Sequence, residues 1–256
     1  MSRWRPVPLN CLYVIPDVHG MYRQLRLVLN RILPLRKSDG GLDRLVMLGD
    51  YIDRGTRGPD VVDLLIKLKA KYPHQLKLLK GNHEDMILEV IKSSASSDAY
   101  MMWMKNGGEE TLAAYLKRAD ITIENPYLFP RDRIKNIIPF EHLDFFSSLD
   151  LYYEDEDFIF VHAGCDPFVP LGQQSTEPFL WDRSLYRAAY RGYKLPCLRT
   201  IVTGHNTNRY GNPLVTEKFM MLDCSYVGNL LVVEMNSMDA FVAKKGKGRL
   251  VRYKFA

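Results

Sequence analysis

Residues 45–55, with the sequence LVMLGDYIDRG, decide the fold because an apolar run changes there directly into a polar loop. The run Leu45–Leu48 predicts a buried strand. After Pro59, which is well placed at a helix start, apolar side chains recur at helical spacing. The same order of strand, polar loop and helix begins at Leu12–Ile15 and again at Leu76–Leu79. Three such units within about 80 residues predict an α/β fold with parallel strands.

The rest of the chain predicts a helical insertion followed by further strands. Residues 98–148 show helical spacing, with NGG at 106–108 as a stop between two helices. Apolar runs around an acidic turn predict a hairpin within 151–161, and a further strand is expected at 199–203. No repeat or linker occurs, so the sequence predicts one domain, residues 1–256. The last segments predict an antiparallel sheet: 214–217, 219–222, 230–235, 240–243 and 249–253.

Composition and charge argue against several classes of protein. The chain has 256 residues, 46% apolar and 25% charged, which allows a sizeable core and does not suggest a disordered or fibrous protein. The net charge is +5, and the compact basic stretch at 244–249 is interpreted as a solvated surface. No aromatic platform accompanies the basic residues, so a nucleic-acid partner is not expected. No apolar run approaches the length of a membrane span.

The four cysteines, Cys11, Cys165, Cys197 and Cys224, lie far apart and form no CxxC pair. This spacing argues against a zinc knuckle or a redox pair and favours free thiols in a reducing compartment. The first ten residues lack the apolar segment of a signal peptide. The sequence therefore predicts a cytoplasmic protein that does not associate with a membrane.

Polar side chains gather in the loops that follow the predicted strands. Because ligands of parallel sheets bind at the carboxyl ends of the strands, these loops are expected to meet. Carboxylate, imidazole and amide ligands without cysteine suit divalent manganese, iron or zinc better than a structural zinc site. Two cations about 3.5–4 Å apart can activate a water, and Asp50 in the middle loop is the natural bridge between them. The set comprises Asp17, His19, Asp50, Asp53, Arg54, Asn82, His83, His162 and His205.

Each of these residues also has a structural interpretation. An isolated Asp-x-His, as in Asp17 and His19, occurs by chance and often caps a turn, and aspartate and asparagine are common in turns. The spacing of GDYIDRG (49–55) and GNHE (81–84), about 30 residues apart, is not plausibly explained by turns alone. The metal interpretation is therefore the stronger one.

Other side chains near these loops receive structural interpretations. Trp103 and Trp181 are expected to pack in the core. Glu84 and Asp85 are expected to stabilise the positive end of the helix that follows GNHE. These residues are not included in the predicted site.

Five motifs give the chain a wider resemblance: PDVHG (16–20), GDYIDRG (49–55), GNHE (81–84), HAG (162–164) and GH (204–205). In this order they strongly resemble the phosphoprotein phosphatase family of calcineurin-like metallophosphoesterases, over nearly the whole chain. The resemblance implies a β-sandwich of two mixed sheets flanked by helices, with the helical insertion at 98–148. Similarity to the bacterial and phage branch is carried by three further segments: NGG (106–108), LWDR (180–183) and LDCSYVGNL (222–230).

The resemblance implies two sets of metal ligands joined by Asp50. The first cation would be bound by Asp17 and His19, and Asp50 would bridge to the second. The second set would be completed by Asn82, His162 and His205, with Asn82 also counted among the phosphate-binding residues.

The resemblance also implies roles in binding and catalysis. Arg54 and Arg183 would bind phosphate oxygens, Arg54 with its planar fork. The alternative for Arg183 is an ordinary surface arginine. His83 would protonate the leaving oxygen as general acid, and Asp53 would orient it. A hydroxide bridging the two metals would attack phosphorus directly, without a phosphoenzyme.

The first functional hypothesis is a serine/threonine-type protein phosphatase that uses two divalent cations, manganese first, with iron or zinc as alternatives. Its substrates would be phosphorylated proteins or small phosphate esters. The second hypothesis is hydrolysis of dinucleoside polyphosphates such as diadenosine tetraphosphate, since such relatives share the same metal loops. The third is a scaffold that has lost catalysis, which predicts a missing ligand, whereas every expected ligand is present. The sequence does not indicate an oligomeric state.

The chain departs from the family pattern at three points. Pro16 stands where glycine is usual, and because proline fixes its backbone angle and lacks an N–H, we expect a tighter first loop. Lys80 stands where relatives often have arginine, and lysine cannot form a two-pronged contact with phosphate. The last motif continues as GHNTN, which leaves His205 intact.

Overall fold

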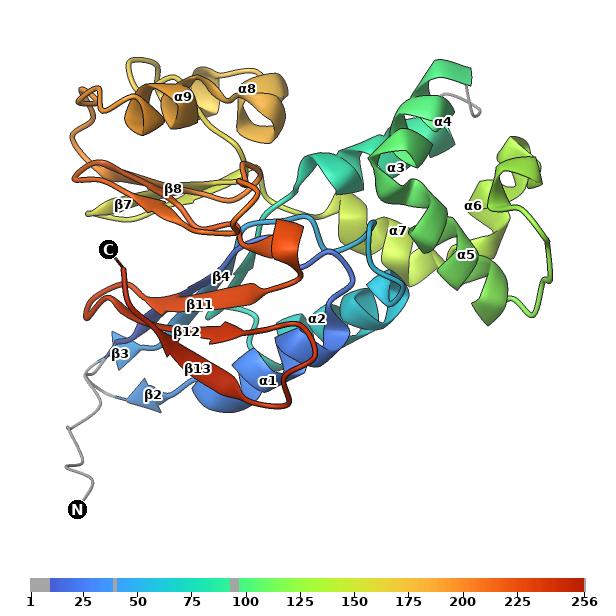
Figure 1. Cartoon of the computed structure of the whole chain (residues 1–256), viewed down its shortest axis with the longest axis horizontal. Helices are drawn as coiled ribbons and strands as arrows, with labels where there is room; N and C mark the ends of the chain where they lie inside the picture. The colour runs from blue at the N-terminus through green and yellow to red at the C-terminus, as the bar shows by residue number, and fades with distance from the viewer. Residues whose placement is uncertain (1–9, 39–40, 93–96, 256) are drawn as a thin grey trace.

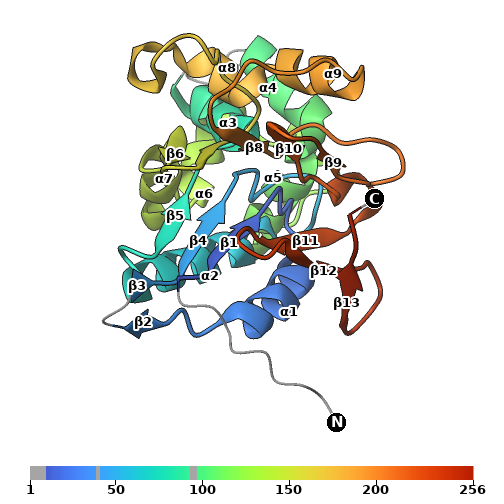
Figure 2. The same ribbon diagram turned by 90° about the vertical axis from the view of Figure 1, so that its left-hand side faces the viewer.

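A computed structural model describes residues 10–38, 41–92 and 97–255 of the chain. Two β-sheets lie face to face, with helices on their outer sides (Figure 1). The view turned by 90° shows the smaller sheet above the larger one (Figure 2). The predicted sandwich of two mixed sheets flanked by helices is therefore confirmed. Residues 1–9, which entered the prediction of location, lie outside the described residues.

The larger sheet has six strands in the order β13-β12-β11-β1-β4-β5. Its parallel half consists of the strands of the three predicted strand–loop–helix units, β1 (Leu12–Ile15), β4 (Arg44–Met47) and β5 (Leu76–Leu78). Its antiparallel half continues from β1 through β11 (Leu230–Glu234), β12 (Asp239–Ala243) and β13 (Leu250–Tyr253). The sheet is therefore mixed, with its two halves joined at β1.

The smaller sheet has five strands in the order β6-β7-β8-β10-β9. β6 (Tyr152–Glu154) and β7 (Phe158–Val161) form the predicted hairpin. β8 (Thr200–Thr203) lies parallel to both β7 and β10 (Phe219–Met221), and β9 (Leu214–Val215) pairs antiparallel with β10.

The prediction of one antiparallel sheet from residues 214 to 253 is wrong. β9 and β10 belong to the smaller sheet, β10 is parallel to β8, and only β11, β12 and β13 form the expected antiparallel series. Local alternation of side chains indicates a strand, but it does not say which strand will be its neighbour. A short pair, β2 (Lys37–Ser38) with β3 (Gly41–Leu42), was also not predicted.

The central strands are buried on both faces, as expected for parallel strands covered on both sides. Because side chains alternate along a strand, Val14 packs between the two sheets with Phe160 and Val202 of the smaller one. The next residue, Ile15, packs instead with the helices on the outer face of the larger sheet. One apolar layer therefore joins the two sheets, and a second joins the larger sheet to its helices.

Helices cover both outer faces. α1 (Tyr22–Ile32) and α2 (Gly58–Lys71) lie on the larger sheet, whereas α8 (Thr176–Trp181) and α9 (Ser184–Tyr190) lie on the smaller one (Figure 1). Short 3-10 turns occur at η4 (Leu171–Gln173) and η5 (Ser225–Val227). No helix in the described part of the chain combines the length and apolar character needed to cross a bilayer.

A group of helices stands at one end of the sandwich and confirms the predicted insertion at 98–148 (Figure 1). α3 (Asn82–Lys92) leads into it, and η1 (Met104–Gly108) contains a kink at Gly107, at the predicted stop at 106–108. The other members are α4 (Ser97–Trp103), α5 (Glu109–Arg118), η2 (Pro126–Leu128), η3 (Arg131–Arg133), α6 (Ile134–Ile137) and α7 (Phe140–Ser147).

Candidate active site

The predicted site residues come together where loops from the two sheets meet. Loops after β1 and β4, together with the start of α3 after β5, bring seven of them from the larger sheet. Loops after β7 and β8 bring His162 and His205 from the smaller sheet. All of these side chains except that of Arg54 are buried. The expectation that the strand-end loops converge is therefore confirmed.

Unusual backbone conformations are concentrated in these loops. Eight described non-glycine residues have positive φ, and five of them belong to the predicted site. A left-handed residue costs roughly 1–2 kcal/mol, and such costs persist at functional sites, where the surroundings impose the conformation. The five are His19 (41°), Asp50 (52°), Asp53 (65°), Arg54 (62°) and His205 (58°).

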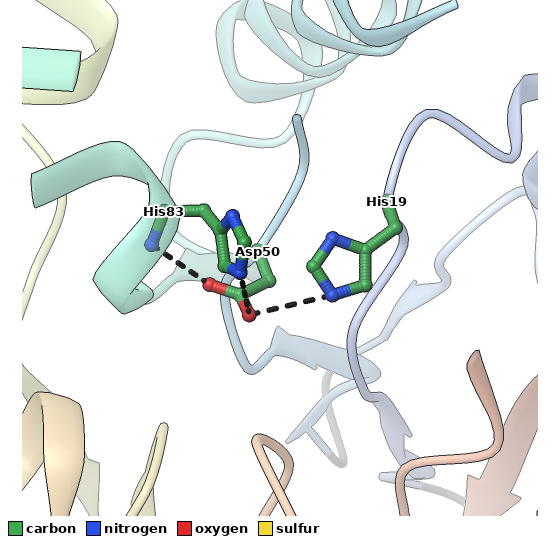
Figure 3. Close-up of side chains that lie close together, drawn as sticks. All are labelled: His19, Asp50 and His83. Atoms are coloured by element: carbon green, nitrogen blue, oxygen red, sulfur yellow. Dashed lines mark hydrogen bonds and ion pairs between the residues drawn. The ribbon is translucent and has the colours of Figure 1, made fainter. Parts of the chain in front are cut away.

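Asp50 lies at the centre, and Figure 3 shows it between His19 and His83. Its Oδ2 atom is 3.5 Å from His19 Nε2 and 3.7 Å from His83 Nε2. Its Oδ1 atom is 3.4 Å from His162 Nε2 and accepts the backbone N–H of His83 at 3.2 Å. Two groups of possible metal ligands share it: His19, Asp50 and His83 form one, and Asp50, His162 and His205 form the other. One carboxylate thus faces imidazoles from both sheets.

Asn82 and Asp17 complete this centre. The Oδ1 atom of Asn82 lies 2.9 Å from both His162 Nε2 and His205 Nδ1. Asp17 accepts the backbone N–H of His205 at 3.0 and 3.1 Å, and its Oδ2 is 3.9 Å from His19 Nε2. The first and last motifs, 188 residues apart, are therefore in direct contact.

The protonation of His162 tests whether these residues fit a cation. Its Nδ1 lies 2.8 Å from the carbonyl oxygen of Leu48, which can only accept, so Nδ1 carries the hydrogen. Burial lowers the pKa of His162 to about 3, so the ring is neutral and Nε2 presents a bare lone pair. That lone pair faces oxygens of Asn82 and Asp50. A cation between these atoms would satisfy lone pairs that otherwise face one another, and the donor set fits divalent metals.

His19 and His205 are the other buried imidazoles at this centre. The Nδ1 atom of His19 donates to the carbonyl oxygen of Ile52 at 2.9 Å, which leaves the lone pair of Nε2 facing the centre, where Arg54 Nη1 lies 3.0 Å away. Burial lowers the pKa of both imidazoles. The Nε2 atom of His205 is buried without a hydrogen-bond partner among the described residues. The Nδ1 atom of His205 lies 2.9 Å from Asn82 Oδ1, so this other ring nitrogen is the one that faces the ligands of the centre.

Asp53 and His83 form a buried pair on one side of this centre. His83 Nδ1 lies 2.7 Å from Asp53 Oδ2. Burial raises the pKa of Asp53 to about 7, while hydrogen bonds with Thr111 and Trp103 oppose the rise. The indole N–H of Trp103 donates to both carboxylate oxygens, at 3.1 and 3.0 Å. Trp103 is buried as predicted, but it also orients Asp53, a contact that helical spacing could not reveal.

Arg54 extends over the centre from a backbone held by the helical insertion. Its Nη1 and Nη2 atoms lie 3.0 Å from His19 Nε2 and 3.1 Å from His83 Nε2. Its backbone N–H donates to the carbonyl oxygen of Gly107 at 3.0 Å. Gly107 has φ of 100°, and an added Cβ would lie 2.7 Å from Arg54 Cγ. The stop at 106–108 is therefore also a support for Arg54.

Arg183 lies in the same open cavity as Arg54. The cavity has a volume of about 1080 Å³, and His19 and His205 line its floor beside the two arginines. Arg183 is exposed at the start of α9 and lines this space. All predicted site residues are thus gathered at one place.

Two buried carboxylates at the site were not predicted to take part in it. Glu84 accepts backbone N–H groups of Asp50, Tyr51, Ile52 and Gly81 at 2.7–3.3 Å. It therefore holds the loop of Asp50 in place, in addition to any effect on α3, in whose first turn it lies. The residue type and position were visible in the sequence, but three of its four partners lie more than 30 residues away.

Asp223 is the other such carboxylate. It is buried after β10, in the segment 222–230 that contributed to the resemblance. Burial raises the pKa of Asp17, and the charges of Asp223 and Asp50 raise it further. One Asp223 oxygen is buried without a partner among the described residues. The concentration of buried negative charge again favours a bound cation.

A Glu84→Gln variant is expected to lower the free energy of unfolding by about 2–4 kcal/mol. An amide nitrogen in place of one oxygen would face two backbone N–H donors, neither of which could be satisfied there. Chemical denaturation measures the change. Asp85→Asn is a matched control, since it removes the same charge from the same helix turn and is expected to cost less than about 1 kcal/mol. Equal losses would show that only the helix end is affected.

The two mixed sheets and the buried cluster of possible metal ligands resemble those of phosphoesterases. A family model described as calcineurin-like phosphoesterase matches residues 12–222, a range that contains every predicted site residue. The chain therefore belongs to the calcineurin-like phosphoesterase family. The resemblance inferred from the five motifs is confirmed.

The chain also resembles individual curated proteins over part of its length. The chain is similar to the serine/threonine-protein phosphatase SIT4 of Candida albicans, with 42% identity over 71 residues, 28% of this chain and 22% of that protein. It thus spans only a small part of such curated relatives, 22% and 18% of two of them. The similarity to these proteins is therefore limited to one segment.

Solved structures resemble the chain over almost its whole length. A protein proposed to be a diadenosine tetraphosphatase has a TM-score of 0.56 at 18% identity, covering 97% of this chain and 95% of that one. The cold-active protein-tyrosine phosphatase of a Shewanella species has a TM-score of 0.57 at 16% identity, covering 96% and 81%. At such low identity these similarities show the fold alone.

Proposed function

We propose that this chain hydrolyses phosphate monoesters and acts on phosphoserine and phosphothreonine side chains of proteins. The observation that carries the proposal is the central Asp50, whose two oxygens face imidazoles from both sheets. The segment similar to SIT4 supports the preference for serine and threonine. A scaffold without catalysis would have no reason to keep a complete ligand set together with a buried His83–Asp53 pair.

Two divalent cations fit the centre, and we propose manganese as the activating metal, with iron or zinc as alternatives. Asp17, His19 and Asp50 would hold one cation. When bound, the pair would lower the pKa of a water molecule and place positive charge beside the phosphate oxygens. The other cation would be held by Asp50, Asn82, His162 and His205.

The side chains around the centre bind the substrate and move a proton. Arg54 and Arg183, which line one cavity, would grip phosphate oxygens, and Asn82 would contact the phosphate as well. His83 would donate a proton from Nε2 to the leaving oxygen. Asp53 accepts the hydrogen bond from Nδ1 and so keeps the ring oriented for that transfer.

Arg54→Ala is expected to weaken competitive inhibition by inorganic phosphate about 10- to 100-fold, because hydrogen bonds to charged groups are lost. The inhibition constant of Arg54→Lys should lie between those of the wild-type protein and Arg54→Ala, because lysine keeps the charge and lacks the planar fork. Inhibition constants measured with p-nitrophenyl phosphate as substrate report the effect. Unaltered phosphate inhibition in Arg54→Ala would contradict the assignment.

Hydrolysis of dinucleoside polyphosphates is the second candidate, favoured by the full-length likeness to a proposed diadenosine tetraphosphatase. The metal loops cannot separate the two activities, because both reactions need the same centre. A side-by-side assay with manganese, comparing a phosphoserine peptide and diadenosine tetraphosphate, tests the choice. A higher kcat/KM for the peptide supports the first proposal, and a higher value for the nucleotide supports the second.

We further propose that the whole chain acts as one domain in a reducing, cytoplasmic environment. The apolar layer between the sheets contains residues from both ends of the sequence, which supports a single unit. The four cysteines form no disulfide among the described residues, and three of them are buried, which suits a reducing compartment. Limited proteolysis that released a stable fragment would argue against the single domain.

A further inference from the structure

A basic trough lies beside the catalytic cavity, between the start of α1 and the turn that joins β12 to β13. Its volume is about 760 Å³. The turn carries the basic stretch at 244–249, which the sequence alone suggested was an ordinary solvated surface. In the fold, that stretch forms one wall of a concave site. We define the trough by its cationic side chains: Arg23, Arg26, Arg57, Lys244, Lys245 and Lys247.

The charge of this trough is unusually one-sided. Among the described residues that line it, none is an aspartate or a glutamate, and the same holds for the catalytic cavity beside it. One of the six cations is partly neutralised, since Arg57 Nε lies 2.6 Å from Asp60 Oδ2. The six cations therefore form a locally positive surface in a chain whose net charge is only +5. A concave surface lined by one sign of charge attracts ligands of the other.

The trough adjoins the catalytic cavity. Both spaces are lined by residues of the first turn of α1, by Arg57 and by Lys245. The shared wall is held in place, because Gln24 Nε2 donates to the carbonyl oxygen of Gly228 at 3.2 Å. The first turn of α1, which has no acidic residue, adds the positive end of a helix. A substrate whose scissile phosphate contacts Arg54 can therefore extend past these shared residues toward the trough.

We infer that the trough binds a second phosphate group of the substrate, next to the one that is hydrolysed. This inference rests on the proposed phosphoesterase function and refines its substrate class. A substrate with one phosphate would leave the trough unused, whereas a polyphosphate chain or a second phosphorylated residue would fill it. The second phosphate binds through charge and hydrogen bonds and takes no part in the chemistry.

A charge-reversed double variant, Lys244→Glu with Lys247→Glu, tests the inference. Both residues line the trough and neither lines the catalytic cavity. The matched control is Lys117→Glu with Lys135→Glu, which changes the net charge equally on exposed residues of the helical insertion. Thermal unfolding confirms that both variants fold. The substrates are p-nitrophenyl phosphate, inorganic tripolyphosphate, and a peptide with one or two phosphoserines.

The trough variant is expected to lose about 10- to 100-fold in kcat/KM for substrates with a second phosphate, and little for p-nitrophenyl phosphate. A loss specific to tripolyphosphate identifies a phosphate chain as the occupant, and a loss specific to the doubly phosphorylated peptide identifies a second phosphorylated residue. Equal behaviour of trough and control variants on every substrate would overturn the inference while leaving the phosphoesterase proposal intact.

Binding to metal-free protein provides an independent readout. Calorimetric titration with tripolyphosphate in the presence of excess chelator requires no catalysis. The wild-type protein and the control variant are expected to bind with similar affinity, and the trough variant about 10- to 100-fold more weakly, with a smaller dependence on salt. If no substrate is hydrolysed but this pattern holds, the proposed reaction fails and the anion site stands. Equal affinities in all three proteins would refute the site.

Discussion

Asp50→Asn is expected to deprive the protein of both cations and to lower kcat/KM for p-nitrophenyl phosphate by more than about 100-fold. The structure gives the reason, because each oxygen of Asp50 faces a different group of imidazoles. Asparagine has the same shape as aspartate, but an NH₂ group replaces one carboxylate oxygen and offers no lone pair to a metal. Replacing even an outer partner of a metal ligand costs about 10- to 100-fold, so the loss of a shared ligand should exceed that.

Elemental analysis after dialysis against manganese provides the measurement for Asp50→Asn. We expect about two cations per chain in the wild-type protein and fewer than about one in the variant. Asp144→Asn, an exposed substitution of the same kind on α7, serves as the control and should keep both. Unchanged metal content in Asp50→Asn would rule out its bridging position. Selective loss of one cation would place Asp50 in a single ligand set.

His83→Asn is expected to slow hydrolysis of an alkyl phosphate by about 10²- to 10⁴-fold, the usual contribution of a general acid. The same change should lower the rate with p-nitrophenyl phosphate by less than about 10-fold, because nitrophenolate leaves without needing a proton. The ratio of the two losses is therefore the diagnostic quantity. Equal losses for both substrates would exclude proton donation to the leaving group.

The structure also permits a competing role for His83, since its Nε2 lies 3.7 Å from Asp50 Oδ2 and it belongs to one possible ligand group. Metal content separates the two roles. A general acid can be removed with both cations retained, whereas removal of a ligand releases one. Asp53→Asn should show the same substrate dependence in weaker form, because Asp53 acts only by orienting His83.

Much of the site could be predicted because its residues follow strands directly. Each strand is a short apolar run, so its end is visible in the sequence, and parallel strands end at the same edge of a sheet. Asp17, Asp50 and Asn82 could therefore be placed together from the sequence alone. His162 and His205 were harder, since they come from the second sheet, and the order of the motifs linked them to the others.

What escaped prediction depends on contacts between segments far apart in the chain. Glu84 looked like a residue that stabilises a helix end, yet it binds backbone groups of the Asp50 loop. Trp103 had the spacing of a core residue, yet its N–H orients Asp53. The alternation of side chains along β10 indicates a strand but does not reveal that β8 is its neighbour. Sequence patterns indicate where a helix or strand forms, whereas contacts between distant segments depend on the tertiary structure.

The two sheets contribute different ligands to one centre, with Asp50 from the larger and His162 and His205 from the smaller. A cation that binds there selects the assembled sandwich over any state in which the sheets separate. At a free concentration of about 100 times its Kd, such a ligand adds roughly 2.7 kcal/mol for a single site. The melting temperature then depends on the metal concentration of the buffer as well as on the chain. Preparations made with and without chelator should differ in shelf life even when their sequences are identical.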